Sequence, residues 1–451
     1  MYVIYKLTFF FRYRNSIKQS LNSASVYQIP RGTRDFTPDE MGKRRYVENV
    51  MKNTFKTFGY REVQTPTFEH LELFTAKSGD AVIDELYSFQ DKGGRDLALR
   101  PELTAPVMRF YVDKLQMEPK PLKLFYLGNC YRYDRPQKGR YREFTQAGCE
   151  LIGTGTNEAY AELIALAYHI LRNVGLKNIN LKIGNLNILS VVFDKLKLTQ
   201  DQKRHITPLI DKSMFGDISL ALKDFNVPEI EIQEFLSFLQ TGSIQEITDY
   251  VPDNDEALNE LNTMKQISVL LKTSFGIENF QISMGIVRGL DYYKGPVFEI
   301  EAPCLGAEKQ LCGGGAYELI SLFGGRESPT SGFAIGFDRT IVALETEEFN
   351  FPRSEIDVYI IPVQKECMKK GLDIAQQLRK NNIKTDIDLL NRGMGKCLKY
   401  ASTISAKFVF ILGERELTED SITIRNMENG QQELLKINDV ISWIKTQLNI
   451  I

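Results

Sequence analysis

One short stretch of the chain carries, at every second position, groups that suit the binding of a small charged molecule. Phe144 supplies an aromatic ring, Gln146 an amide and Glu150 a carboxylate, while Gly148 between them has no side chain. Side chains two residues apart share one face of a strand, and a glycine within a strand often marks the close approach of a ligand. Together with Arg132 on the preceding segment, this face has the donors and acceptors to bind a zwitterion and a phosphate.

Two strands joined by a basic hairpin must position these groups. Residues 122–133 are apolar on both faces, which predicts a buried strand. The loop that follows contains Pro136 and Gly139, which favour a turn, and it is rich in arginine and lysine. The pattern alone fits equally well a hairpin with one solvated face and a charged loop.

Two other segments carry polar groups beside apolar runs. In LALRPELTAP, Glu102 and Thr104 are predicted to point to the same side of an extended segment, where a carboxylate and a hydroxyl could hold an ammonium group. In SGFAIGFDRTIVAL, a strand and Gly336 lead into a helix that has Arg339 in its first turn. An arginine there can stack on a base or pair with a phosphate. The alternative for the first segment is a solvent-exposed turn, and for the second it is an arginine on a helix surface.

A third segment, VRGLDYYKGPVFEIE, places Arg288 before a turn and Tyr292 and Tyr293 before a strand. The glycines of LCGGGAYELISLFGG follow closely, and consecutive glycines allow a backbone to approach a ligand. Taken by itself, the first of these two segments fits an edge strand with surface tyrosines.

The composition is that of a globular protein of two or three domains. The chain has 451 residues, of which 25% are charged and 43% hydrophobic. The formal net charge is -2, so an RNA partner would have to be bound by local basic patches. The six cysteines form no CxxC pair and there are three histidines, which argues against a zinc site or a disulfide framework and fits a reducing cytoplasm. No apolar run reaches the roughly 18 residues of a membrane span.

Changes in composition and in the pattern of polar and apolar residues along the chain predict its domain organisation. Residues 1–27 lack acidic side chains and are either a targeting presequence or, as we favour, an extension outside the core. Residues 28–190 and 276–345 are predicted to form one domain, interrupted at 191–275 by a polar, helical insertion. After a linker, residues 355–451 alternate strands and helices, as an α/β domain does.

The stretch Tyr126–Gly153 resembles motif 2 of the class II aminoacyl-tRNA synthetases, in the form found in the histidyl-tRNA synthetase family. The likeness lies in RYDRPQKGRYREF and in QAGCE. RGLDYY resembles the first histidine-specific motif of that family, and SGFAIGFDR resembles motif 3 of the class. The second histidine-specific motif is usually GGRYD; here Ala316 and Glu318 replace its arginine and aspartate, and Leu103 stands where many relatives have glycine.

The resemblance implies a fold and an activity. The fold is an α+β catalytic domain built on an antiparallel sheet, with a helical insertion and a C-terminal α/β domain with a mixed sheet that binds the anticodon. The activity is the ligation of histidine to tRNA. ATP, with Mg²⁺, activates L-histidine as histidyl-adenylate, and the histidyl group then passes to the 3′ end of tRNA(His). The resemblance further implies a homodimer, located in the cytoplasm and without a membrane partner.

The resemblance also implies roles for individual residues. Arg132 and Arg288 would flank the α-phosphate as catalytic residues. ATP would be bound by Arg132, Asp134, Phe144 and Arg339. Histidine would be bound by Glu102, Leu103, Thr104, Gln146, Glu150, Arg288, Tyr292 and Tyr293.

Two other functions compete with this one. A non-catalytic, synthetase-like regulator of histidine biosynthesis would bind histidine or a partner enzyme. Such paralogues typically lack the C-terminal module and lose matched arginines, whereas this chain has both. A class II enzyme for another amino acid could share the C-terminal domain, but RGLDYY argues against it.

Overall fold

The computed structural model describes residues 27–78, 80–134, 139–251, 254–287, 293–352 and 355–449. The chain divides into two compact units. Arg44–Asn350 and the segment before Thr37 form the larger unit, and Thr37–Lys43 with Phe351–Ile451 form the smaller one. The predicted N-terminal extension lies outside the described residues except for Tyr27. Within the described ranges, no helix is both long enough and apolar enough to span a bilayer.

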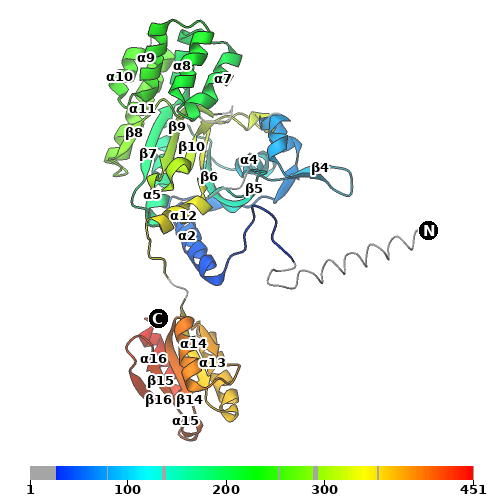
Figure 1. The fold of residues 1–451 in the computed structure, drawn as a ribbon, viewed down its shortest axis with the longest axis vertical. Coiled ribbons are helices and arrows are strands. Elements are labelled where there is room, and N and C mark those ends of the chain that lie inside the picture. Colours follow the sequence, from blue (N-terminus) through cyan, green and yellow to red (C-terminus); the bar gives the residue numbers. More distant parts are fainter. Residues whose placement is uncertain are drawn as a thin grey trace, which may run out of the picture. The chain divides into compact units, whose positions relative to one another are not determined.

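The larger unit is built on a sheet of eight described strands in the order β1-β5-β6-β11-β10-β9-β7-β8 (Figure 1). Its middle is antiparallel, and the edge pairs β1–β5 and β7–β8 are parallel. The predicted hairpin is formed by β5 and β6, which pair along their whole length. The bounds are β1 (Arg61–Glu62), β5 (Leu122–Tyr131), β6 (Glu143–Ile152), β7 (Asn180–Asn185), β8 (Phe280–Ile282), β9 (Tyr293–Glu301), β10 (Gln310–Tyr317) and β11 (Thr330–Gly336).

Helices with one apolar side pack against this sheet. They are α2 (Pro38–Thr57), α5 (Asn157–Asn173) and α12 (Phe337–Thr346) (Figure 1). Phe55 of α2 stacks on Phe125 of β5 and Phe333 of β11, with ring centroids 4.8 and 5.9 Å away. Thr156 begins α5 by accepting the backbone N–H of Ala159 at 3.3 Å, as an N-cap residue does.

A run of helices connects β7 to β8, where the sequence predicts a polar, helical stretch. Thr199 and Gln202 cap the first turn of α7 reciprocally, and Asn254 caps α11. Helix α11 packs against α5 and α6, while α7 to α10 gather at one end of the unit (Figure 1). The bounds are α6 (Leu186–Lys195), α7 (Gln200–Asp211), α8 (Phe215–Asp224), α9 (Glu229–Gln240), α10 (Ile244–Tyr250) and α11 (Asp255–Thr273).

A second antiparallel sheet, in the order β2-β4-β3, precedes the hairpin. Its strand β4 leads into α4, and Leu73, Phe74, Ala98 and Ala105 form a small buried cluster that fixes this connection. The bounds are β2 (Phe68–His70), α3 (Glu72–Ser78), β3 (Ser88–Gln90), β4 (Asp96–Leu99) and α4 (Thr104–Phe110). Short helical turns lie at η1 (Asp80–Glu85), η2 (Tyr111–Leu115), η3 (Pro303–Glu308) and η4 (Ser321–Phe323).

The smaller unit contains a mixed sheet in the order β13-β12-β14-β15-β16. Strands β12, β13 and β14 are parallel, and β15 and β16 form an antiparallel hairpin. The hairpin turns at Asn429-Gly430, where Gly430 has a positive φ of 74° that glycine adopts without strain. The bounds are β12 (Ile356–Pro362), β13 (Thr385–Ile387), β14 (Ala406–Leu412), β15 (Ser421–Asn426) and β16 (Gln432–Lys436).

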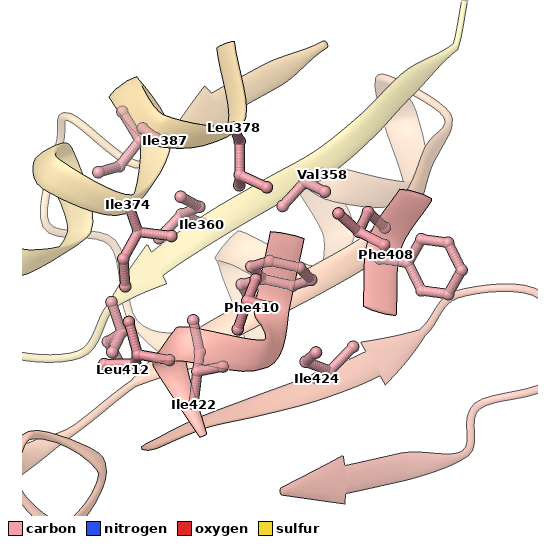
Figure 2. Packing of buried hydrophobic residues seen from close by; sticks show 14 of the residues in the cluster. Val358, Ile360, Ile374, Leu378, Ile387, Phe408, Phe410, Leu412, Ile422 and Ile424 are labelled. Carbon is pink, nitrogen blue, oxygen red and sulfur yellow. The ribbon is translucent and has the colours of Figure 1, made fainter. Parts of the chain in front are cut away.

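Helices cover both faces of this mixed sheet. Apolar side chains of α13 (Met368–Lys380) and α16 (Val440–Gln447) pack on one face, where Ile374 and Leu378 meet Ile360 and Phe410 (Figure 2). Helix α14 (Met394–Thr403) covers the other face. Short turns lie at η5 (Lys365–Cys367) and η6 (Ile437–Asp439), and α15 (Glu414–Thr418) precedes β15. The predicted fold class is therefore confirmed, with a mainly antiparallel sheet in the larger unit, helices, and a C-terminal domain with a mixed sheet.

Candidate active site

A cavity of about 490 Å³ opens over β6, β10 and β11 of the larger unit, and this volume falls in the usual range for small-molecule sites. Segments far apart in sequence contribute to its walls. The residues with predicted site roles that line it are Glu102, Thr104, Arg132, Asp134, Phe144, Gln146, Tyr293 and Arg339. Arg288 and Tyr292 lie outside the described residues.

The guanidinium groups of Arg132 and Arg339 both line this cavity. Arg132 follows β5, donates from Nε to the carbonyl of Pro101 at 3.0 Å, and lies with Cζ 5.2 Å from the ring centroid of Phe144. Arg339 lies in the first turn of α12 and donates from Nη1 to the carbonyl of Gln310 at 3.0 Å. Backbone hydrogen bonds thus fix both cations on the cavity wall, with the Phe144 ring beside Arg132, an arrangement suited to a nucleotide phosphate and its base.

The sequence predicts an extended segment around Glu102, but a helix begins there instead. Thr104 is the first residue of α4, and the Glu102 carboxylate accepts the backbone N–H groups of Thr104 at 2.6 Å and Ala105 at 3.1 Å. N–H groups in the first turn of a helix have no partner within the helix, so they attract the carboxylate. A short helix, and not a strand, therefore places Glu102 and Thr104 on the cavity wall. The side chain of Leu103 is 2% exposed, packs in the hydrophobic core and does not line the cavity.

Gln146 is held by a residue that sequence reasoning missed. The thiol of Cys130, on the neighbouring strand β5, donates to Gln146 Oε1 at 3.4 Å. Burial raises the pKa of Cys130 to about 12, so the group stays a neutral thiol donor at physiological pH. A buried cysteine next to an amide carries no distinct sequence signal.

Glu150 does not line the cavity, although it was predicted to contact the imidazole of histidine. Its carboxylate is fully buried and lies between two tyrosines. The hydroxyl of Tyr126 donates to it at 2.9 Å, and the hydroxyl of Tyr317 donates to its other oxygen. Burial raises the pKa of Glu150 to about 8. Tyr317 lines the cavity and packs edge-on against Tyr293 at 5.9 Å, so it connects the carboxyl group to the cavity wall.

Two glycines make room for this buried group. A Cβ on Gly332, which lines the cavity, would lie 2.0 Å from Glu150 Oε2. Gly148 was predicted to mark the approach of a ligand, but a Cβ there would meet the carbonyl of Phe333 at 2.5 Å and the Tyr126 ring at 2.7 Å. Gly148 therefore accommodates Tyr126, whose hydroxyl then reaches Glu150.

The two substituted positions of the second histidine-specific motif lie at the end of β10. Ala316 is buried, and Glu318 pairs with Lys294 of β9 at 2.5 Å. Neither of them lines the cavity over β6, β10 and β11. Among the described residues, no group of three or more histidine, cysteine, aspartate or glutamate side chains is arranged to hold a metal ion.

These features define a class of protein. A mainly antiparallel sheet in which the basic β5–β6 hairpin brings Arg132, and the helix after β11 brings Arg339, to one cavity is the architecture of a class II aminoacyl-tRNA synthetase.

Comparison with known proteins gives the family within this class. A model of the histidyl-tRNA synthetase family matches residues 32–340, and an anticodon binding domain model matches residues 357–447. The histidine–tRNA ligase of Methanosarcina acetivorans is 43% identical over 93% of this chain and 98% of its own length. That of Archaeoglobus fulgidus is 42% identical over 92% and 99%, respectively. The structure of apo S. aureus histidyl-tRNA synthetase is 30% identical, with a TM-score of 0.73, over 93% of this chain and 100% of its own. The chain belongs to the histidyl-tRNA synthetase family.

Proposed function

We propose that this chain activates L-histidine with ATP and transfers the histidyl group to the 3′ end of tRNA(His). A histidine carboxylate oxygen attacks the α-phosphorus of ATP, a new O–P bond forms, and the bond to the bridging oxygen breaks so that pyrophosphate leaves. The hydroxyl of the terminal ribose of the tRNA then displaces AMP. The observation that carries this proposal is the convergence of Glu102, Arg132, Gln146 and Arg339 on one cavity in a chain of this family.

At the nucleotide end, Phe144 would stack on the adenine and Arg339 would cover its other face or hold the γ-phosphate. Negative charge builds on the α-phosphoryl oxygens during transfer, and fixed cations stabilise it. Arg132 supplies one such cation, and we propose Arg288 for the opposite side. Backbone carbonyls already hold the described guanidinium groups, so little reorganisation is needed during the reaction.

Magnesium would arrive with ATP. Mg²⁺ is usually held by substrate phosphates, waters and one or two carboxylates. The described part of the chain has no ready-made cluster of metal ligands, but the cavity wall includes Glu85 and Asp134. This donor set fits an ion that is held mainly by the phosphates, and the ion would neutralise the charge of the leaving pyrophosphate.

At the histidine end, the ammonium group would be bound by Glu102, Thr104 and Gln146. The imidazole has two nitrogens that each need a partner. We assign this role to Tyr293 and to Tyr317, with Glu150 acting behind Tyr317. A site built from such hydrogen bonds can reject analogues that lack them by about 10⁴-fold or more.

The C-terminal unit would bind the anticodon of the tRNA. Its match to an anticodon binding domain supports this assignment, and Lys396 and Lys399 are exposed on α14. A homodimer and a cytoplasmic location complete the proposal, as predictions from the family resemblance and from the cysteine usage.

Histidine-dependent exchange between pyrophosphate and ATP tests this function. We expect exchange with histidine and not with the other amino acids. A regulatory, non-catalytic relative would bind histidine without exchange, and a class II enzyme of other specificity would exchange with another amino acid. Either outcome would overturn the proposal.

A further inference from the structure

A buried carboxylate lies immediately before Arg339 and contacts three separate segments of the chain. Asp338, in the first turn of α12, is 4% exposed. Its Oδ1 accepts Arg34 Nη2 and Arg44 Nη1, both at 2.6 Å, and its Oδ2 accepts the backbone N–H of Thr145 at 2.7 Å. The carboxylate thus ties the segment before α2 and the helix α2 to β6 and α12.

The arginines of this cluster make further contacts on the hairpin. The Arg34 guanidinium lies 3.4 Å from the ring centroid of Tyr141, in the part of the hairpin loop that leads into β6. Arg44 Nη2 also donates to Thr145 Oγ1 at 2.9 Å. Arg34 belongs to the segment RGTRDF at residues 31–36, which leads into α2 and is called the lead-in below. The lead-in therefore braces the hairpin from outside the cavity.

A second contact of the lead-in acts on the same loop. The carbonyl of Gly32 accepts the backbone N–H of Arg142 at 2.9 Å. Gly32 has a φ of +88°, and a Cβ there would lie 2.7 Å from Arg142 Cγ. A glycine is needed for this close approach. Two independent contacts therefore fix the lead-in against the hairpin.

The neighbours of the tied residues are the proposed ATP contacts. Thr145 follows Phe144 directly, and Asp338 precedes Arg339. Fixing Thr145 relative to Asp338 thus sets the distance between the aromatic ring and the guanidinium that would enclose the adenine. We propose that Asp338, braced by Arg34 and Arg44, is a positioning residue that holds the two sides of the ATP subsite in register. This inference rests on the proposed function, because it takes the cavity to be the site of ATP.

The energetics give the carboxylate a role that a neutral group of the same shape cannot fill. Hydrogen bonds to charged groups are among the strongest in proteins. In Asp338→Asn, Arg34 and Arg44 would face each other over a buried amide that carries no charge to balance theirs. The hairpin is then free to shift against α12. A displacement of about 1 Å at a reacting group can cost about 10²-fold in rate.

The test is Asp338→Asn in the full-length chain, with histidine-dependent pyrophosphate exchange as the assay. We expect the KM for ATP to rise by about tenfold or more, while the KM for histidine changes by less than about threefold. Arg34→Ala, at a partly exposed side chain, is expected to raise the KM for ATP in the same direction. Arg34→Lys keeps the charge and should restore most of the loss, which an unspecific packing defect would not do.

Glu301→Gln provides a matched control. Glu301 is a buried carboxylate of β9 that also pairs with two cations, Lys182 at 2.9 Å and Lys309 at 3.3 Å, and it does not line the cavity. This variant should leave the KM for ATP unchanged even if it lowers the melting temperature.

The outcomes separate this inference from the proposed function. If the unaltered chain shows no histidine-dependent exchange, the proposed function fails. If it shows exchange, equal KM values for ATP in Asp338→Asn and Glu301→Gln would overturn the positioning role. Should Asp338→Asn not fold, Arg34→Ala decides instead: an unchanged KM for ATP contradicts the inference, and a rise that Arg34→Lys reverses supports it.

Discussion

Replacing Glu150 by glutamine changes a fully buried ionisable group beside the candidate site. The carboxyl group is enclosed by Tyr126, Tyr317 and the backbone at Gly332, and no cation is bonded to it among the described residues. Glutamine has the same shape and keeps an oxygen acceptor, but it cannot ionise. The substitution therefore removes the titration and preserves the packing.

The size of the effect follows from the pKa. Burial raises the pKa of Glu150 from its usual 4.5 to about 8. Between these values the folded chain holds a proton that the unfolded chain releases, so its unfolding free energy falls as the pH rises. At about 1.4 kcal/mol per pH unit, the full titration corresponds to about 5 kcal/mol. Below the unfolded-state pKa, Glu150 is protonated in the folded and the unfolded chain, and its contribution to the unfolding free energy is fully present. Above the folded-state pKa, Glu150 is ionised in both and this contribution is lost.

Urea unfolding of both chains across this pH range measures the effect. We expect the unfolding free energy of the unaltered chain to fall by up to about 4 kcal/mol between about pH 5 and pH 8, relative to that of Glu150→Gln. Titration of all other groups is common to both chains, so the difference between the two curves isolates Glu150.

Parallel curves for the two chains would refute the reasoning, because they would mean that Glu150 is ionised in the folded state at neutral pH. The same variant tests the site. If Glu150 acts on the imidazole through Tyr317, the exchange assay should show weaker selection of histidine over other amino acids. Unchanged discrimination would argue against this role.

Three further predictions concern single residues of the site. Gly332→Ala should remove most histidine activation and destabilise the fold by about 1–3 kcal/mol, because its Cβ would lie 2.0 Å from Glu150 Oε2; Gly216→Ala on α8, where a Cβ meets nothing within 4 Å, is the control. Arg339→Ala should raise the KM for ATP by about tenfold or more in pyrophosphate exchange, and an unchanged KM would exclude it from the ATP subsite. Arg288→Ala should lower adenylate formation by about 10²–10³-fold, the effect of one lost transition-state donor; near-normal exchange would remove Arg288 from the mechanism.

Much of the fold could be predicted from the sequence because hydrophobic periodicity and turn residues act locally. The predicted strand at 122–133 corresponds to β5. Asn429-Gly430, a dipeptide typical of tight hairpin turns, lies where β15 turns into β16. The alternation of Phe144, Gln146 and Glu150 was also interpreted correctly as one face of a strand.

Features set by long-range contacts could not be predicted. Gly148 was predicted to mark the close approach of a ligand, because the sequence does not reveal that Tyr126 of the neighbouring strand lies against it. Asp338 escaped notice because its partner Arg34 is 304 positions away in the chain. The error at Glu102 has a local cause instead: an extended segment was expected, but the carboxylate accepts the N–H groups two and three residues later, which the start of α4 leaves without a partner in the helix.

The proposed activity can be measured directly by the charging of a tRNA(His) transcript with labelled histidine by the full-length chain. We expect ATP-dependent attachment of histidine to the 3′ end of this tRNA, and none to a tRNA with an unrelated acceptor end and anticodon. Adenylate formation without transfer, or transfer of a different amino acid, would contradict the proposed activity.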